Sequence, residues 1–114
     1  MHPGGCQCGK VRYEVRVDLD APVMSCNCSM CGRAGTLLTF VPASQFKLLS
    51  GEDQLTDYQF NRHAIHHLFC RVCGIKSFAR GAGKEGPTVA INARCLDDVE
   101  VGKLKINAFD GRAR

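Results

Sequence analysis

The feature that most constrains this chain is the spacing of its eight cysteines, because seven of them lie in three short clusters. Two clusters are tight turns in which a glycine follows the second cysteine, at residues 6–9 and 70–74. Glycine permits the positive φ that turns backbone N–H groups toward the two sulfur atoms. Two such turns can supply four thiolates to one tetrahedral ion. We therefore predict a closed, structural zinc site on Cys6, Cys8, Cys70 and Cys73.

The third cluster places Cys26, Cys28 and Cys31 within six positions. Each spacing is short enough for the three thiolates to share one ion, but a tetrahedral ion would then be one ligand short. Three protein ligands with an open fourth position are typical of zinc sites that bind water or a substrate. We therefore predict a second zinc, which makes two per chain, and take this site as the candidate catalytic centre.

Cys95 is the remaining thiol and a further candidate for the catalytic centre. It could supply the fourth ligand of the second zinc, or face a substrate as a free thiol. It could also be buried as a small hydrophobic residue. The sequence leaves these three roles open.

Disulfides are the main alternative for so many cysteines, because small secreted domains often use them to support a weak core. The N-terminus argues against secretion, since residues 1–5 lead into Cys6 without the apolar run of about 7 to 15 residues that a signal needs. No apolar stretch approaches the roughly 20 residues of a membrane span either. A cytoplasmic, reducing location is expected, and there clustered cysteines more often bind metal. An iron–sulfur cluster remains an alternative for such thiolate-rich sites.

The formal net charge of +4 would suggest an anionic partner if every cysteine were neutral. Seven bound thiolates and two Zn²⁺ ions would lower the net charge to about +1, because coordination deprotonates the thiol. No run of Lys and Arg interleaved with aromatic residues predicts a nucleic-acid groove. A nucleic-acid partner is therefore not expected.

The length of 114 residues suits a single domain over residues 1–114, because separate domains usually need about 100 residues each. Alternating apolar and polar side chains predict a half-buried strand at 10–17. A helical turn is predicted at 42–45 and an exposed loop at 81–87. Further strands are predicted at 36–41, 46–49, 55–60, 65–70, 75–80, 88–95 and 104–109. No segment has helical periodicity over three turns, so the predicted fold class is all-β, with mainly antiparallel sheets around a structural zinc.

Three histidines, His63, His66 and His67, precede Cys70. Neighbouring residues of a strand face opposite sides, so His66 and His67 cannot both ligate one ion. A surface or hydrogen-bonded role is the simpler reading for each histidine. Four arginines could bind a carboxylate, but a solvated surface role is the simpler reading for each, namely Arg62, Arg71, Arg80 and Arg94.

Three motifs in this order, at residues 5–9, 26–31 and 69–74, resemble the glutathione-dependent formaldehyde-activating enzyme family. The resemblance extends to residues 41–44 and 58–61 and covers the chain from 5 to about 111. The stretch 61–78 is closest to the centromere protein V-like branch. Relatives usually continue past residue 111 with an aromatic-containing tail, so this chain, which has no Trp, is expected to lack a lid or closing strand.

The resemblance implies a mostly β fold around a structural zinc and a second zinc on Cys26, Cys28 and Cys31. It also implies a carbon–sulfur lyase reaction run in the synthetic direction, in which glutathione and formaldehyde or a related small aldehyde form S-(hydroxymethyl)glutathione. A three-thiolate zinc is a weak Lewis acid but suits the binding of a thiol, so we expect the glutathione sulfur at the open position. The alternative is a non-catalytic, zinc-stabilised module that binds a protein or chromatin partner.

Overall fold

The computed structural model describes residues 1–60, 64–83 and 86–111, and most of these residues lie in or between β-strands. The strands are β1 His2–Gly5, β2 Arg12–Val15, β3 Val23–Cys26, β4 Leu38–Pro42, β5 Phe46–Ser50, β6 Leu55–Tyr58, β7 His66–Cys70, β8 Phe78–Gly83, β9 Gly86–Asn92 and β10 Ile106–Phe109. The α-helix of the described part is α1, Ser29–Ala34. Short 3-10 turns lie at Ala43–Gln45, Glu52–Gln54, Ala93–Cys95 and Val101–Lys103. The prediction of an all-β fold is confirmed.

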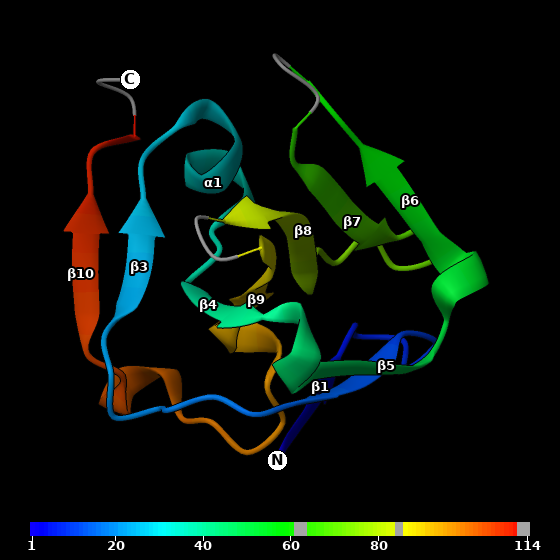
Figure 1. Cartoon of the computed structure of the whole chain (residues 1–114), viewed down its shortest axis with the longest axis horizontal. Coiled ribbons are helices and arrows are strands. Elements are labelled where there is room, and N and C mark those ends of the chain that lie inside the picture. Colours follow the sequence, from blue (N-terminus) through cyan, green and yellow to red (C-terminus); the bar gives the residue numbers. More distant parts are fainter. Residues whose placement is uncertain (61–63, 84–85, 112–114) are drawn as a thin grey trace.

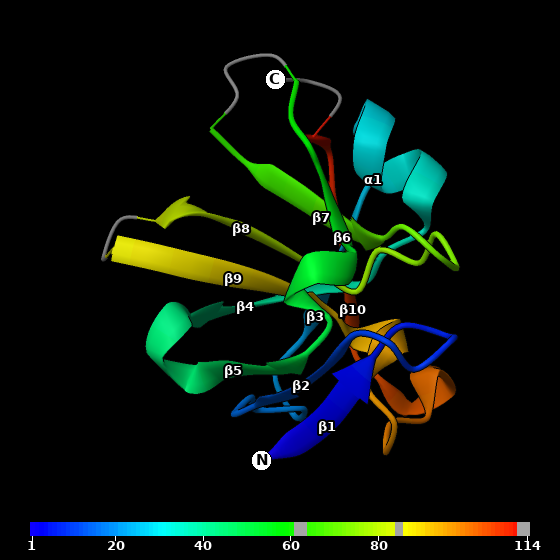
Figure 2. The same ribbon diagram turned by 90° about the vertical axis from the view of Figure 1, so that its right-hand side faces the viewer.

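The strands form two sheets (Figure 1). The smaller sheet has the order β1-β2-β5, and the larger has the order β10-β3-β4-β9-β8-β7-β6. Neighbouring strands are antiparallel except for β10 and β3, which run parallel. Figure 2 shows the smaller sheet below β4 and β9, and the β8–β9 hairpin extending away from it. The chain therefore has to hold two separate sheets together.

The core contains side chains from both sheets. Tyr13 of β2 and Phe46 of β5 meet Phe78 of β8, and their ring centroids lie 4.8 to 5.8 Å apart. The Tyr13 hydroxyl donates to the Ser77 carbonyl at 3.3 Å, which satisfies its buried polar atom. The Arg80 guanidinium packs over the rings of Phe46 and Phe78, at 5.1 and 5.4 Å from their centroids. Arg80 thus directs its charge toward this aromatic group.

Each predicted strand is present, although several are shorter or shifted, and the helical turn predicted at 42–45 is the 3-10 turn Ala43–Gln45. The exposed loop predicted at 81–87 is wrong in its described part, because residues 81–83 belong to β8 and Gly86 begins β9. Glycine weakens the sequence signal of a strand, yet its backbone can still pair, as Gly81 does with Thr88. Residues 84–85 lie outside the described part.

Two strands and the α-helix were not predicted, namely β1, β3 and α1. The β1 sequence His-Pro-Gly-Gly has little intrinsic preference for a strand, and it is stabilised by pairing with β2. The helix α1 has six residues, too few for the periodic pattern that identifies a helix in a sequence.

The side chain of Asn92, at the end of β9, joins three backbone segments. Its Nδ2 donates to the Lys76 carbonyl at 3.0 Å, and its Oδ1 accepts from the N–H groups of Leu37 at 3.3 Å and Arg94 at 3.2 Å. Because Asn92 is 7% exposed, these bonds are shielded from water. They hold the segment before β8 against the start of β4.

We predict that Asn92→Ala lowers the free energy of unfolding by about 2–3 kcal/mol, because largely buried backbone groups lose their partners. Denaturant titration of the metal-loaded protein measures this change. Asn107→Ala, at an exposed position of β10, is the matched control and should change it by less than about 0.5 kcal/mol. Equal losses in the two variants would contradict the role given to Asn92.

Candidate metal centres

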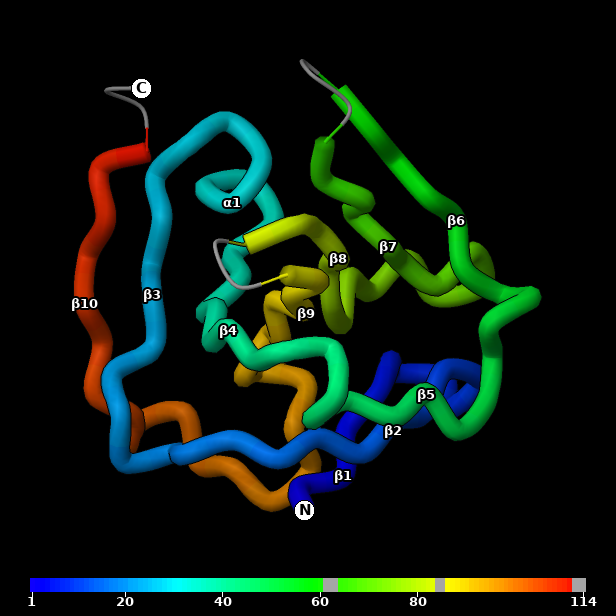
Figure 3. The backbone as a smooth tube through the Cα atoms, in the orientation of Figure 1, coloured from blue at the N-terminus to red at the C-terminus, as the bar shows by residue number. Residues whose placement is uncertain are grey.

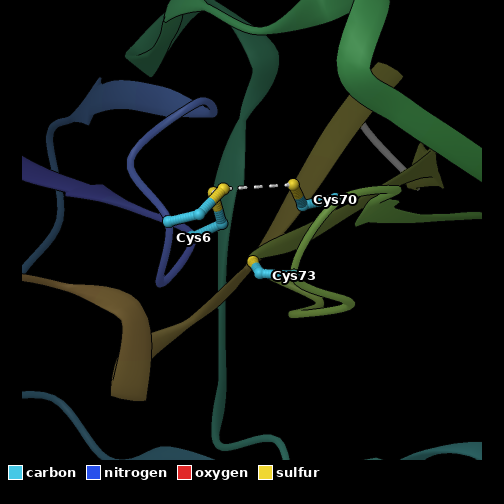
Figure 4. A group of neighbouring side chains, drawn as sticks. Cys6, Cys70 and Cys73 are labelled. Atoms are coloured by element: carbon cyan, nitrogen blue, oxygen red, sulfur yellow. Dashed lines mark hydrogen bonds between the residues drawn. The ribbon is translucent and has the colours of Figure 1, made fainter.

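Cys6, Cys8, Cys70 and Cys73 come together although the two pairs are far apart in the sequence. Their sulfur atoms all lie within 4.8 Å of one another. Figure 4 shows the side chains of Cys6, Cys70 and Cys73 pointing toward a common centre. Cys6 directly follows β1 of the smaller sheet, whereas Cys70 ends β7 of the larger one. This four-cysteine group therefore joins the two sheets.

The sulfur separations in the four-cysteine group fit a tetrahedral metal ion. The Sγ atoms of Cys6 and Cys8 lie 3.6 Å apart, and those of Cys8 and Cys70 lie 3.7 Å apart. A tetrahedron with Zn–S bonds of about 2.3 Å has edges of about 3.8 Å. These two separations are close to that edge length, and the remaining ones are at most 4.8 Å, so the group is near the geometry of a bound ion of this size.

The two cysteine turns of this group have the backbone geometry that their glycines were expected to allow. Gly9 has φ of 85° and Gly74 has φ of 80°, in the left-handed region. The N–H of Val11 donates to the Cys6 sulfur at 3.3 Å, and the N–H of Val72 donates to the Cys70 sulfur at 3.4 Å. Such N–H···S bonds stabilise thiolates, which are the form that binds metal.

The thiols of this group affect one another's ionisation. Burial alone would raise the pKa of Cys73, but the N–H groups of Ile75 and Cys8 and the neighbouring thiols lower it to about 6. At Cys8 the Lys10 N–H lowers the pKa, but burial and the other three thiols together outweigh it and raise the pKa to about 11. Four thiolates this close require a cation among them to ionise together.

Cys26, Cys28 and Cys31 form a second group, whose sulfur atoms also lie within 4.8 Å of one another. Cys26 ends β3, and Cys28 caps the start of α1, where its sulfur accepts the Cys31 N–H at 3.3 Å. Within the described ranges no fourth His, Cys, Asp or Glu joins this three-cysteine group. The group can hold a metal ion with one position free, as its spacing predicts.

The three-cysteine group lies in the wall of a cavity of about 460 Å³. Figure 3 shows α1 and β3 on one side of this region and β7 and β8 on the other. The rest of the wall is mainly apolar. It includes Met24, Leu38, Phe40, Phe60, Ile65 and Phe109, together with His67 and Lys76. A ligand at the free position would therefore enter a mainly apolar pocket with a few polar side chains.

His67 and Lys76 contact each other in this cavity, with 2.8 Å between Lys76 Nζ and His67 Nδ1. An ammonium can only donate, so His67 accepts through Nδ1. Burial, and then the charge of Lys76, lower the pKa of His67 to about 4, so its ring is neutral near pH 7. Burial also lowers the pKa of Lys76, while the charges of Cys31 and Cys28 oppose this.

Lys76 was not identified as a candidate from the sequence, which shows only a lysine near the start of a predicted strand. The structure places it directly before the buried residues Ser77 and Phe78. His67 was named, and the expectation that it and His66 face opposite ways agrees with their contacts. His66 pairs with Asp57 at 2.7 Å, whereas the His67 ring stacks on Phe60 with centroids 5.3 Å apart.

Cys95 lies apart from the three-cysteine group. Its sulfur is 3.9 Å from the Lys76 carbonyl. Burial raises its pKa to about 11, and the charges of Cys6 and Cys73 add to this effect. Its electrostatic neighbours thus belong to the four-cysteine group.

The remaining candidates of the sequence have structural contacts where they are described. Arg71 donates to the Gln54 side chain at 3.4 Å, and Arg94 donates to the Gly35 carbonyl at 3.1 Å. Arg62 and His63 lie outside the described residues.

Comparison with known proteins decides the family. Residues 1–110 match the family model described as glutathione-dependent formaldehyde-activating enzyme. The chain belongs to this family. Its structure is similar to the crystal structure of a Rhodobacter sphaeroides protein, with a TM-score of 0.79 and 29% sequence identity. The similarity covers 92% of this chain and 99% of that one. In this formaldehyde-activating family member, no helix among the described residues is long and apolar enough to cross a membrane.

Gly111 lies against the three-cysteine group in this formaldehyde-activating family member, since a Cβ there would be 2.5 Å from the Cys26 sulfur and 3.2 Å from Cys28 Cβ. We predict that Gly111→Ala displaces Cys26 and weakens metal binding at this group by about 10- to 100-fold, as changes beside metal ligands do. Competition with a chromophoric chelator measures the affinity.

The four-cysteine group should keep its metal in Gly111→Ala, because it does not contact this position. Gly102→Ala is the matched control, since a Cβ at Gly102 has no neighbour within 4 Å. An unchanged affinity at the three-cysteine group would show that Gly111 does not support it.

Proposed function

We propose that this protein binds two zinc ions and that its three-cysteine group combines a thiol with a small aldehyde. At the level of the family, the name indicates glutathione and formaldehyde as the reacting pair. The observation that carries the proposal is the opening of a three-ligand group into a cavity, because a purely structural site would be closed by a fourth ligand.

Zinc is the ion that suits both groups best. Thiolates are soft ligands, and four of them in a tetrahedral arrangement are typical of structural zinc. The four-cysteine group would hold the structural ion through Cys6, Cys8, Cys70 and Cys73. The second ion would be held by Cys26, Cys28 and Cys31, where it would lower the pKa of an added thiol and present it as a thiolate near pH 7.

The residues of the chain bind and orient the reactants in this proposal. The apolar side chains of Met24 and Leu38 limit the water around the reacting atoms. The Cys31 N–H holds the sulfur of Cys28 in place. The thiol sulfur bonds to the carbonyl carbon, the thiol loses its proton and the carbonyl oxygen gains one. The product is S-(hydroxymethyl)glutathione, as in a carbon–sulfur lyase reaction run in the synthetic direction.

The zinc content of two cysteine variants tests the assignment of the groups. Purified protein should contain two zinc ions per chain, and Cys26→Ser should lose one of them while it keeps the fold. Cys8→Ser should lose the other ion and much of the thermal stability, because the four-cysteine group joins the two sheets. Metal analysis and thermal unfolding by circular dichroism give both results.

Loss of the fold in Cys26→Ser would instead favour the alternative, a zinc-stabilised module that binds a protein or chromatin partner. Thiol titration of the zinc-loaded protein should find one free thiol, that of Cys95. If no free thiol is found, Cys95 would be a metal ligand and the three-cysteine site would be closed.

The activity itself is tested by NMR exchange spectroscopy of glutathione with formaldehyde. The zinc-loaded protein should speed their exchange with S-(hydroxymethyl)glutathione above the uncatalysed rate. Cys26→Ser should remove the acceleration, because the three-cysteine group no longer holds its ion. An exchange rate equal to that without protein would reject the proposed activity. The cytoplasmic location remains a prediction.

A further inference from the structure

Lys76 is the cation that faces the cavity of the three-cysteine group. Arg80 also contributes to the wall, but its guanidinium lies over Phe46 and Phe78, on the other face of β8. Among the described residues that line the cavity there is no Asp or Glu. The side-chain charges around a bound ligand are therefore those of the cysteines and of Lys76.

The Lys76 ammonium has donor capacity that its protein contacts do not use. It carries three N–H donors, and one of them is taken by Nδ1 of the neutral His67. Among the described residues it forms no ion pair with a carboxylate. Lys76 is partly buried, and the anionic groups near it are the thiolates of Cys28 and Cys31 rather than a carboxylate. Two of its N–H groups are therefore suited to an anion that enters the cavity.

The fold holds this lysine in position from both ends. Its carbonyl accepts from Asn92 at 3.0 Å, which fixes the backbone. Its ammonium is held by His67, which is buried and stacked on Phe60 at an interplanar angle of 25°. A charge held in this way is preorganised, which is what stabilises charge that develops during a reaction.

We propose that the Lys76 ammonium, oriented by His67, is an anion subsite of this cavity and binds the oxygen that becomes negative when a thiolate attacks a carbonyl carbon. Lys76 is then a catalytic residue and His67 a positioning residue. This inference rests on the proposed function for its reaction, but the subsite itself can be tested by binding alone.

The step balances without a further reactant. A sulfur lone pair forms the S–C bond, and the π pair of the carbonyl moves to its oxygen. Lys76 stabilises that oxygen by charge and by a hydrogen bond, and keeps its own proton. Water supplies the proton that converts this oxygen to a hydroxyl. The proton that the thiol released to water balances this transfer. The ligand class is thus a small thiol with a negative oxygen close to its sulfur.

Two small thiols of similar size test the subsite by calorimetry with the zinc-loaded protein. Mercaptoacetate carries an anionic oxygen near its sulfur, and ethanethiol does not. The wild-type protein should bind mercaptoacetate at least about tenfold more tightly, because a charge-assisted hydrogen bond is stronger than a contact with water. Lys76→Met should lose this preference, and the negative thiolates should then disfavour mercaptoacetate.

Control variants separate the subsite from a structural role. Lys76→Met should retain two zinc ions, and Lys47→Met, at an exposed position of β5, should behave like the wild type. His67→Asn keeps an acceptor near Nδ1 and should retain most of the preference, whereas His67→Leu should reduce it. Lys76→Gln offers the same comparison if Lys76→Met does not fold.

Exchange kinetics then link the subsite to the reaction. Lys76→Met should slow glutathione–formaldehyde exchange by about 10- to 100-fold, a loss of the size seen when one oxyanion donor is removed. Its affinity for glutathione should fall much less than its exchange rate. In His67→Leu the Lys76 ammonium loses the side chain that orients it. The exchange rate of this variant should therefore depend on pH differently from that of the wild type.

The outcomes distinguish this inference from the proposed function. A preference for mercaptoacetate that survives in Lys76→Met and Lys76→Gln overturns the subsite, as does loss of zinc in both variants. A wild-type protein without exchange activity, but with a preference that depends on Lys76, would reject the reaction and support the subsite. Normal exchange in Lys76→Met would reject the catalytic role.

Discussion

The four sulfur atoms that meet between the two sheets are the contact on which the rest of the structure depends. The smaller sheet has three short strands, which place Tyr13 and Val15 in the core with Phe46 and Leu48 packed against it. So few side chains are a limited source of stability for a chain of 114 residues. A metal ion bound by Cys6, Cys8, Cys70 and Cys73 would add a joint whose strength does not depend on apolar area.

This joint also positions the cavity. The segment that begins with Cys70 supplies two ligands of the four-cysteine group and, three residues after Cys73, the lysine that faces the other group. Asn92 fixes the same segment to β4 and β9. The two cysteine groups are therefore not independent, because a change in the first one alters the position of a charge beside the second.

The cysteine groups could be predicted from the sequence because their chemistry is local, with two or three ligands within a few residues. The alternation of apolar and polar residues likewise identified β2, because successive residues of this strand alternate between partly exposed and buried positions. The contact between Lys76 and His67 could not be predicted in this way. It depends on how β7 and the segment before β8 lie across from each other, and on a cavity whose lining residues come from both ends of the chain and its middle. The β8–β9 hairpin was missed in part because its glycines carry no side chain that could report a buried face.

The distance in sequence between Cys8 and Cys70, 62 residues, has a consequence for the order in which the protein assembles. Closing a loop of this length costs about 2 kcal/mol more conformational entropy than closing the five-residue span from Cys26 to Cys31. During synthesis the first pair of cysteines and the three-cysteine group both emerge before Cys70 exists. An ion captured early can therefore bind across these two sets, and correct folding then requires that ion to exchange its ligands. The concentration of available metal during folding would thus influence the fraction of molecules in which each ion binds its native set of cysteines.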